Sequence, residues 1–440
     1  MPGKRIDPLS EGHPAMGPDA ESVPGPSMHG GRPWFSRIAL GLIVAATGVG
    51  AGDLITASLA GSEVGLALLW AALAGAVLKW VLNEGISRWQ MATSTTLLEG
   101  WAEHFGSVVH WIFFTYFLVW SYAVAGALIN ACGVAGAGIF PIGDPGTSRV
   151  VWGVAHSLVG LALVWAGGFR IFQYVMSVLV AVMVVAVLLT VILIAPDWPR
   201  VAGGLMIPSI PAGGTGWMLA LLGGVGGTVT LLCYGYWIRE KGRTGKEGVR
   251  ESRFDLSVAY GLTAFFGIAM VIIGSRIEVT GRGDTVAVIL ADQLGAALGP
   301  FGRGIFLLGF WGAVFSSLLG VWQGVPYMFA DFVRLRKRTR AGDSAASGPA
   351  GVRAYRAYLL ALAIVPLTLL WFKVQEVQLV YGIVGALFMP FVALTLLVLN
   401  NRVRLVGREF RNGLVINGLL VLTLAFFAYL GVREIIGFLW

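Results

Sequence analysis

Three kinds of residue are scarce in this 440-residue chain, and each scarcity argues against a class of protein. Charged residues make up only 12% of the chain, whereas a soluble domain carries about 25%. Both cysteines, Cys132 and Cys233, lie inside apolar stretches, so no disulfide framework is expected and each is interpreted as a small packing residue. The five histidines show no spacing typical of metal ligands, and we predict that the chain is not an enzyme.

Apolar residues are abundant instead. They make up 57% of the chain, and the mean hydropathy is +0.79, which indicates an integral membrane protein. Residues 1–33 are rich in Gly, Pro, Ser and Asp and contain no apolar run, so we expect a disordered cytoplasmic tail and not a signal peptide. About eleven runs reach the length of about 20 residues that a membrane helix needs. We place these spans at 36–60, 64–90, 106–138, 150–168, 172–195, 215–239, 254–275, 303–332, 355–373, 377–400 and 413–432.

The net charge of +8 is distributed as membrane topology requires. Basic residues cluster at Arg239–Arg253, Arg334–Arg340 and Arg402–Arg411, which follow the sixth, eighth and tenth expected spans. With a cytoplasmic N-terminus, all three clusters lie in the cytoplasm, as the positive-inside rule demands. The lipid bilayer is therefore an expected partner, and nucleic acid is not. We predict a protein of the plasma membrane of a prokaryote, with its C-terminus outside because the number of spans is odd.

Two glycine-dense interruptions fall at matching places in the two halves of the chain. The first runs from Gly48 to Asp53 and the second from Gly223 to Thr228, about 175 residues later. Because each glycine costs a helix roughly 1 kcal/mol relative to alanine, we expect the first and sixth spans to be discontinuous there. Paired breaks of this kind are typical of secondary transporters, whose substrate sites lie at the broken helices.

This arrangement predicts an all-α polytopic membrane protein with the leucine-transporter-type architecture. Residues 34–200 would form a first five-helix repeat and residues 201–400 a second, inverted one, because five crossings place the start of the second repeat on the opposite side of the membrane. Residues 401–440 would contain an eleventh transmembrane helix and the C-terminus. The oligomeric state is left open.

Four stretches of the chain carry a family resemblance. They are Gly52–Trp70, Ser87–Thr93, Pro196–Pro208, and the residues Ser316, Ser317 and Gly320 of the eighth span. Together they resemble the NRAMP family of metal-ion transporters, and the likeness extends over about residues 36–432. The resemblance implies a secondary transporter that moves a small inorganic ion across a membrane.

The chain departs from this family at the positions that bind metal. Metal-transporting members carry Asp-Pro-Gly-Asn at the first break, where this chain has Gly50-Ala51-Gly52-Asp53. At the second break they carry Met-Pro-His, where this chain has Thr230-Leu231-Leu232. Their third helix bears an acidic pair for proton transfer, and Trp120 and Ala123 stand at the equivalent positions here. We therefore expect that transition-metal selectivity and the proton relay are both lost.

The candidate site offers oxygen atoms and main-chain groups. Oxygen ligands suit hard cations better than transition metals, so the first interpretation is a carrier for a hard metal cation such as Mg²⁺, with Asp53 as its metal ligand. No resident cofactor is expected, and a bound Mg²⁺ or Na⁺ would be the transported or coupled ion. Asp53 can alternatively be a helix N-cap. The other candidates are Thr47, Gly226, Gly227, Thr228 and Thr230.

A second interpretation reverses the charge of the cargo. Half-helix N-termini attract anions, and Lys79 lies deep in the second span, where a charged side chain costs about 2.5–3.5 kcal/mol and marks a functional candidate. If Lys79 faces the central cavity, a sodium-coupled transporter of a small anion such as bicarbonate is favoured, with Asp53 on the Na⁺. Alternatively, Lys79 forms a salt-bridge ladder with Glu84 and Arg88 that holds the second helix.

Overall fold

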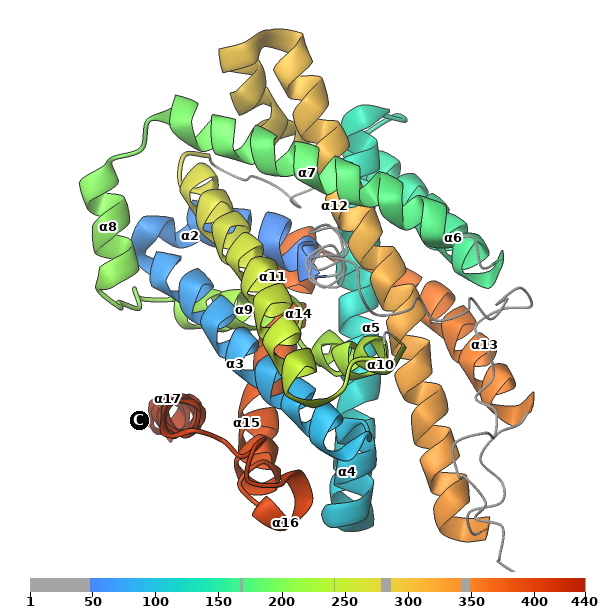
Figure 1. Cartoon of the computed structure of the whole chain (residues 1–440). Helices are drawn as coiled ribbons and strands as arrows, with labels where there is room; N and C mark the ends of the chain where they lie inside the picture. Colours follow the sequence, from blue (N-terminus) through green and yellow to red (C-terminus); the bar gives the residue numbers. More distant parts are fainter. Residues whose placement is uncertain (1–47, 167–168, 241, 278–285, 342–348, 440) are drawn as a thin grey trace, which may run out of the picture.

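The computed structural model describes residues 48–166, 169–240, 242–277, 286–341 and 349–439 (Figure 1). Within these ranges every regular element is a helix. The expected N-terminal tail, the first part of the first span and Thr47 lie outside the described residues.

The first half of the described chain forms the expected apolar helices. A short π-helix, η1 (Gly52–Thr56), continues into α2 and leads to the long helices that follow. The chain turns between α2 and α3 at Gly65, whose φ is +64°. The helices of this half are α2 (Ala57–Val64), α3 (Leu69–Thr93), α4 (Leu97–His104), α5 (Gly106–Ile139), α6 (Pro145–Ala166), α7 (Phe169–Ile194) and α8 (Trp198–Met206).

The second half contains several long helices, of which the longest is kinked. The helix α12 is 56 residues long but kinks at Gly299, where φ is +70°. The helices of this half are α9 (Thr215–Gly224), α10 (Cys233–Glu240), α11 (Gly245–Gly274), α12 (Val286–Ala341), α13 (Pro349–Ile364), α14 (Val374–Ala386), α15 (Phe388–Leu399), α16 (Val403–Val406) and α17 (Leu414–Leu439).

The sixth span is discontinuous, as predicted. Its first half, α9, ends at Gly224, and Val225 is extended with ψ of +118°. Gly226 and Gly227 follow with φ of +79° and +67°, a conformation that only glycine adopts readily. The chain then re-enters helical geometry at η3 (Val229–Leu232), which leads into α10.

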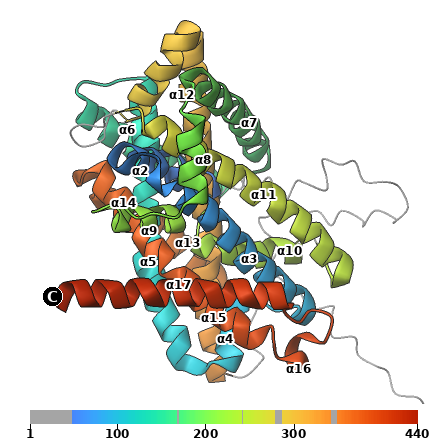
Figure 2. The same cartoon turned by 90° about the vertical axis from the view of Figure 1, so that its left-hand side faces the viewer.

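The first span is described only from Gly48 onward. The chain bends at residues 49–50 and then forms the π-helix η1, an element that is rare and frequent at functional sites. The element η1 packs against α9, α11 and α14. The irregular parts of the first and sixth spans therefore meet in the middle of the bundle (Figures 1 and 2).

Fewer helices in the described residues are long and apolar enough to cross a membrane than the eleven spans expected from the sequence. In the described part of the chain, eight helices are long and apolar enough to cross a membrane, or up to nine if two helices bent by 118°, Ala181–Leu193 and Trp198–Met206, form one span. One of the eight, Gly52–Thr93, combines the first two expected spans, and the last apolar stretch, Leu414–Leu430, is a shorter helix.

Two features concern the expected boundaries of the repeats. The predicted limit at residue 200 falls within α8, so a helix connects the two halves. The last helix, α17, packs on α15 and α3; Figure 2 shows it running across the direction of α5, and in Figure 1 it is seen end-on. The division into repeats and the assignment of α17 as an eleventh span stay predictions.

Candidate functional site

Asp53 connects the two broken helices. It is fully buried in η1, and its Oδ2 accepts hydrogen bonds from Gly50 N–H at 3.3 Å and from Gly226 N–H at 3.2 Å. The N-cap position of η1 is Ala51, so Asp53 stands in the first turn and is not the N-cap residue itself. Its other oxygen, Oδ1, is buried and has no hydrogen-bond partner. A buried polar atom of this kind calls for an explanation such as an ion or a water.

Close backbone contact holds the two breaks together. A Cβ atom added at Gly52 would lie 2.0 Å from the carbonyl oxygen of Gly224. No side-chain rotation can relieve this clash, because the Cβ position is fixed by the main chain of residue 52 and the oxygen belongs to the main chain of Gly224. A Cβ atom at Gly48 would lie 3.4 Å from the carbonyl group of Gly226. The glycines that the sequence places at the breaks therefore allow the first and sixth spans to touch.

Lys79 faces the break in the sixth span. Its side chain is fully buried on α3, and Nζ donates hydrogen bonds to the carbonyl oxygen of Gly223, at 2.8 Å, and to that of Val225. Both acceptors lie at the C-terminal end of α9, the end of a helix that favours a positive charge. Lys79 therefore contacts the break in the sixth span and forms no ladder with Glu84 and Arg88 along its own helix.

Glu84 and Arg88 form a separate ionic cluster. The Nε of Arg88 lies 2.8 Å from Glu84 Oε2, and Arg253 on α11 binds the other carboxylate oxygen at 2.8 Å. Arg88 also donates to the carbonyl of Phe410 and to Asn412 Oδ1. The expected network of three residues is thus divided: Lys79 reaches the break, while Glu84 and Arg88 connect α3 to α11 and to the segment before α17.

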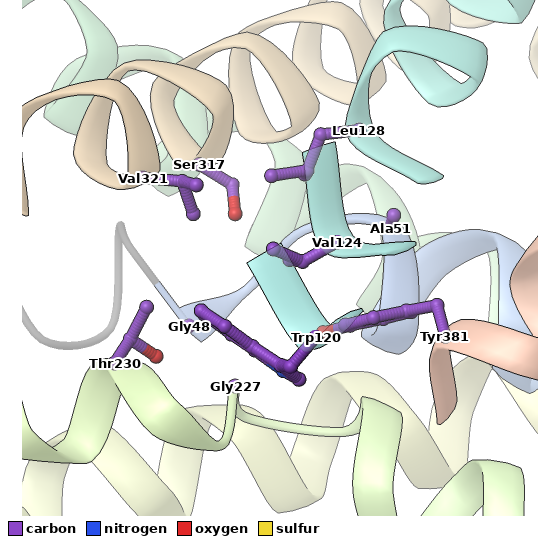
Figure 3. Close-up of a pocket in the computed structure, with 10 residues that line it drawn as sticks. All are labelled: Gly48, Ala51, Trp120, Val124, Leu128, Gly227, Thr230, Ser317, Val321 and Tyr381. Atoms are coloured by element: carbon purple, nitrogen blue, oxygen red, sulfur yellow. The ribbon is translucent and has the colours of Figure 1, made fainter. Parts of the chain in front are cut away.

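A cavity lies beside the two breaks (Figure 3). The cavity is small, about 10 Å³, which is room for about one water molecule. Figure 3 shows Ser317 and Val321 of α12 directed into it from one side and Thr230 from the other, with Trp120 of α5 between them. Asp53 and Lys79 are not among the lining residues. The cavity is lined by Gly48, Ala51, Trp120, Val124, Leu128, Gly227, Thr230, Ser317, Val321 and Tyr381.

The hydroxyl groups near the breaks differ in their surroundings. Thr230 lines the cavity, whereas Thr228 Oγ1 accepts a hydrogen bond from Trp120 Nε1 at 2.9 Å. Trp120 is fully buried, so it connects α5 to the irregular segment of the sixth span. Ser317 lines the cavity, and Ser316 Oγ donates to the carbonyl of Ala313 at 2.9 Å.

Two residues of α14 near the site were not expected from the sequence. Gln378 is fully buried; its Oε1 accepts from Thr56 Oγ1 at 3.1 Å, and its Nε2 donates to the carbonyl of Ala127. Tyr381 lines the cavity and donates to the carbonyl of Gly224 at 3.4 Å. Their spacing of three residues in an otherwise apolar run places both on one helix face, and this was the available signal.

An ionic network joins α10 to α4 and α12. Glu99 on α4 binds Arg239 of α10 at 2.9 Å and Arg334 of α12 at 2.7 Å, and Tyr236 of α10 donates to Asp331 of α12. Burial raises the pKa of Glu99, but the hydrogen bond from Arg334 and the charge of Arg239 outweigh it and leave the pKa below its ordinary value. The second half of the broken sixth span is therefore anchored by charged groups.

The described residues contain no cluster of the side chains that usually bind transition metals. No three side chains of His, Cys, Asp or Glu in these ranges come together in a way that could hold a metal ion. His156 has partners at both ring nitrogens, the carbonyl of Trp152 and the indole N–H of Trp311.

Solved structures of known transporters share this fold. One is a variant of the manganese transporter of Eremococcus coleocola, with 18% identity, a TM-score of 0.63, and coverage of 92% of this chain and 87% of that one. The same transporter in complex with an aromatic bis-isothiourea compound matches at 19% identity, with a TM-score of 0.62 and coverage of 92% and 86%. MhsT in complex with L-phenylalanine matches at 17% identity, with a TM-score of 0.56 and coverage of 92% and 99%.

These matches show an all-α membrane protein with the leucine-transporter-type fold. The sequence pattern of the family described as natural resistance-associated macrophage protein-like (Nramp) matches residues 41–437. The chain therefore belongs to the Nramp family and is a secondary transporter, not an enzyme. No protein of curated function matches it in sequence.

Proposed function

We propose that this Nramp-family transporter moves a hard metal cation, such as Mg²⁺, that binds at Asp53. The observation that carries the proposal is Asp53 Oδ1, a fully buried carboxylate oxygen without a hydrogen-bond partner. Its neighbour Oδ2 is already held by two main-chain N–H groups, so the carboxylate is fixed in position with one oxygen available. A cation is the partner that such an oxygen favours most strongly.

The nearby groups support a hard cation in particular. Thr230, Ser317 and Tyr381 carry hydroxyl oxygens in the cavity beside the two breaks. Mg²⁺ binds through one or two carboxylates, which suits a site with one carboxylate. The lining contains no thioether, thiol or imidazole among the described residues, and these are the groups that favour softer transition metals.

We also propose that this chain lacks the proton relay that the family resemblance would otherwise imply. Trp120 donates to Thr228 and Ala123 is buried, so the two positions expected to bear the acidic pair of the third helix carry an indole and a methyl group. Neither side chain can release or accept a proton at ordinary pH.

The anion interpretation has one observation in its favour, since Lys79 does face the break. However, its ammonium group is bound to two main-chain carbonyls, and no basic side chain is among the described residues that line the cavity. We therefore place a sodium-coupled bicarbonate-like carrier second to a cation carrier.

The test is uptake by proteoliposomes that contain the purified protein, with Mg²⁺, Mn²⁺ and bicarbonate compared with and without a Na⁺ gradient. The proposal expects saturable Mg²⁺ uptake, weaker Mn²⁺ uptake and no bicarbonate uptake. Bicarbonate uptake driven by Na⁺ without Mg²⁺ uptake would establish the anion interpretation. Mn²⁺ uptake of high affinity that Mg²⁺ does not inhibit would refute the preference for hard cations.

The orientation in the membrane follows from the basic residues. The ionic groups Arg88, Arg239 and Arg334 gather where α3 ends and α4 begins, and the positive-inside rule places this end of the molecule in the cytoplasm. We propose a cytoplasmic N-terminus and an outer C-terminus in the plasma membrane of a prokaryote. Labelling of single cysteines introduced at Arg404 and Asp144, with a reagent that cannot cross membranes, tests this orientation.

A further inference from the structure

The Lys79 ammonium group binds main-chain carbonyl oxygens at the C-terminal end of the half-helix α9. Nζ donates to the carbonyls of Gly223 and Val225, which are among the groups left without intrahelical partners when α9 ends. In transporters with broken helices, the unwound carbonyls and the C-terminal ends of half-helices coordinate cations such as Na⁺. A cationic side chain therefore stands where a free cation would find its ligands.

The peptide between Val225 and Gly226 is held from both sides. Its carbonyl accepts from Lys79, and its N–H donates to Asp53 Oδ2. A trans peptide directs these two groups in opposite directions, and the described residues contain no cis peptide. The ammonium and the carboxylate therefore stand on opposite sides of one peptide, and Lys79 takes part in none of the ion pairs of the described chain.

The packing around the lysine fixes its position. Its side chain is fully buried and passes Gly226, where an added Cβ atom would lie 3.6 Å from Lys79 Cδ and 2.8 Å from Thr263 Cγ2. One turn further along α3, Asn83 donates to the hydroxyl of Tyr260 on α11 at 3.1 Å. The lysine thus reaches the break through a closely packed space between α3, α9 and α11.

We propose that Lys79 is a tethered replacement for a monovalent cation. The carbonyl oxygens of Gly223 and Val225 form a cation site, and the ammonium group fills it in every molecule. The transporter therefore needs no soluble monovalent ion at this position, and transport is independent of Na⁺ there. The inference goes beyond the identity of the cargo, because it concerns carbonyls that Asp53 does not contact.

The experiment removes the ammonium group and supplies cations from solution. Lys79→Ala leaves the two carbonyls in place, and its melting temperature is measured in detergent with N-methylglucamine, Na⁺, K⁺ or NH₄⁺ chloride at constant ionic strength. The variant should melt well below the wild type in N-methylglucamine, and NH₄⁺ or Na⁺ should restore most of the difference in a saturable manner. The wild type should respond equally to all four salts.

Two further variants separate a filled cation site from an ordinary structural lysine. Lys79→Met keeps the bulk of the side chain and should lose stability without restoration, because its side chain blocks the site. Lys246→Ala removes an exposed lysine that pairs with Glu409 and should show no response to the choice of cation. Mg²⁺ uptake by the wild type reports separately on the proposed cargo, so failure of either proposal can be recognised.

Three results would overturn the inference. One is a Lys79→Ala protein as stable as the wild type in N-methylglucamine. Another is a Lys79→Ala melting temperature that is the same in all four salts, because a cation site would distinguish small cations from N-methylglucamine at constant ionic strength. The third is a Lys79→Ala protein that folds in none of the salts, because a cation site with its carbonyls intact predicts recovery in NH₄⁺.

Discussion

Replacing Gly52 by alanine tests the contact between the two broken helices. The added Cβ atom would lie 2.0 Å from the Gly224 carbonyl oxygen and 2.3 Å from its carbon, against an ordinary contact of 3.4 Å or more. Overpacking of this kind costs about 1–3 kcal/mol. Separation of the two segments would also weaken the hydrogen bond from Gly226 to Asp53, and a hydrogen bond to a charged group contributes about 1.5–3 kcal/mol. We therefore expect a loss of roughly 3 kcal/mol or more.

The assay for Gly52→Ala is thermal unfolding in detergent together with Mg²⁺ uptake in proteoliposomes. Gly261→Ala is the matched control, because Gly261 lies inside α11 with no atom within 4 Å of its added Cβ. The control should be as stable as the wild type or more stable by up to about 1 kcal/mol. Equal melting temperatures and equal uptake for Gly52→Ala and Gly261→Ala would refute the close contact.

Two further predictions concern the sixth span and its anchor. Gly226→Ala should lower stability by about 1–2 kcal/mol, because φ is +79° there and this conformation is strained in other residues; an unchanged melting temperature would show that the break is not rigid. The pKa of Glu99 is lower in the folded protein than its ordinary value of 4.5, so its contribution is present above that pH and is lost as the pH falls through the folded pKa. A melting temperature that falls on acidification in the wild type but less in Glu99→Gln would confirm this, whereas parallel curves would exclude Glu99 as the cause.

The broken helix could be predicted from the sequence because its signal is local. Gly226 and Gly227 adopt conformations that few other residues tolerate, and two adjacent glycines in an apolar run indicate such a place. The same holds for the pair of Glu84 and Arg88, which the spacing of four residues predicted and the structure contains. Local spacing therefore gave correct partners within one helix.

The partners of Lys79 could not be predicted in this way. Its acceptors lie 144 and 146 residues away in sequence, and only the packing of α3 against α9 brings them together. The cavity residues Val124 and Leu128 likewise carry no chemical signal that separates them from other apolar positions of α5. The hydrogen bond between Asp53 and Gly226 was missed for the same reason, since it depends on how two distant breaks align.

The central claim is that the Asp53 carboxylate holds the transported cation, and equilibrium titration of Mg²⁺ into the purified protein tests it most directly. Asp53→Asn keeps an oxygen that can accept from Gly226 N–H but removes the charge, and Asp292→Asn removes an exposed carboxylate that pairs with Arg303. We predict that the wild type and Asp292→Asn bind Mg²⁺ alike and that Asp53→Asn does not bind it. Equal Mg²⁺ affinity in Asp53→Asn and the wild type would contradict the claim.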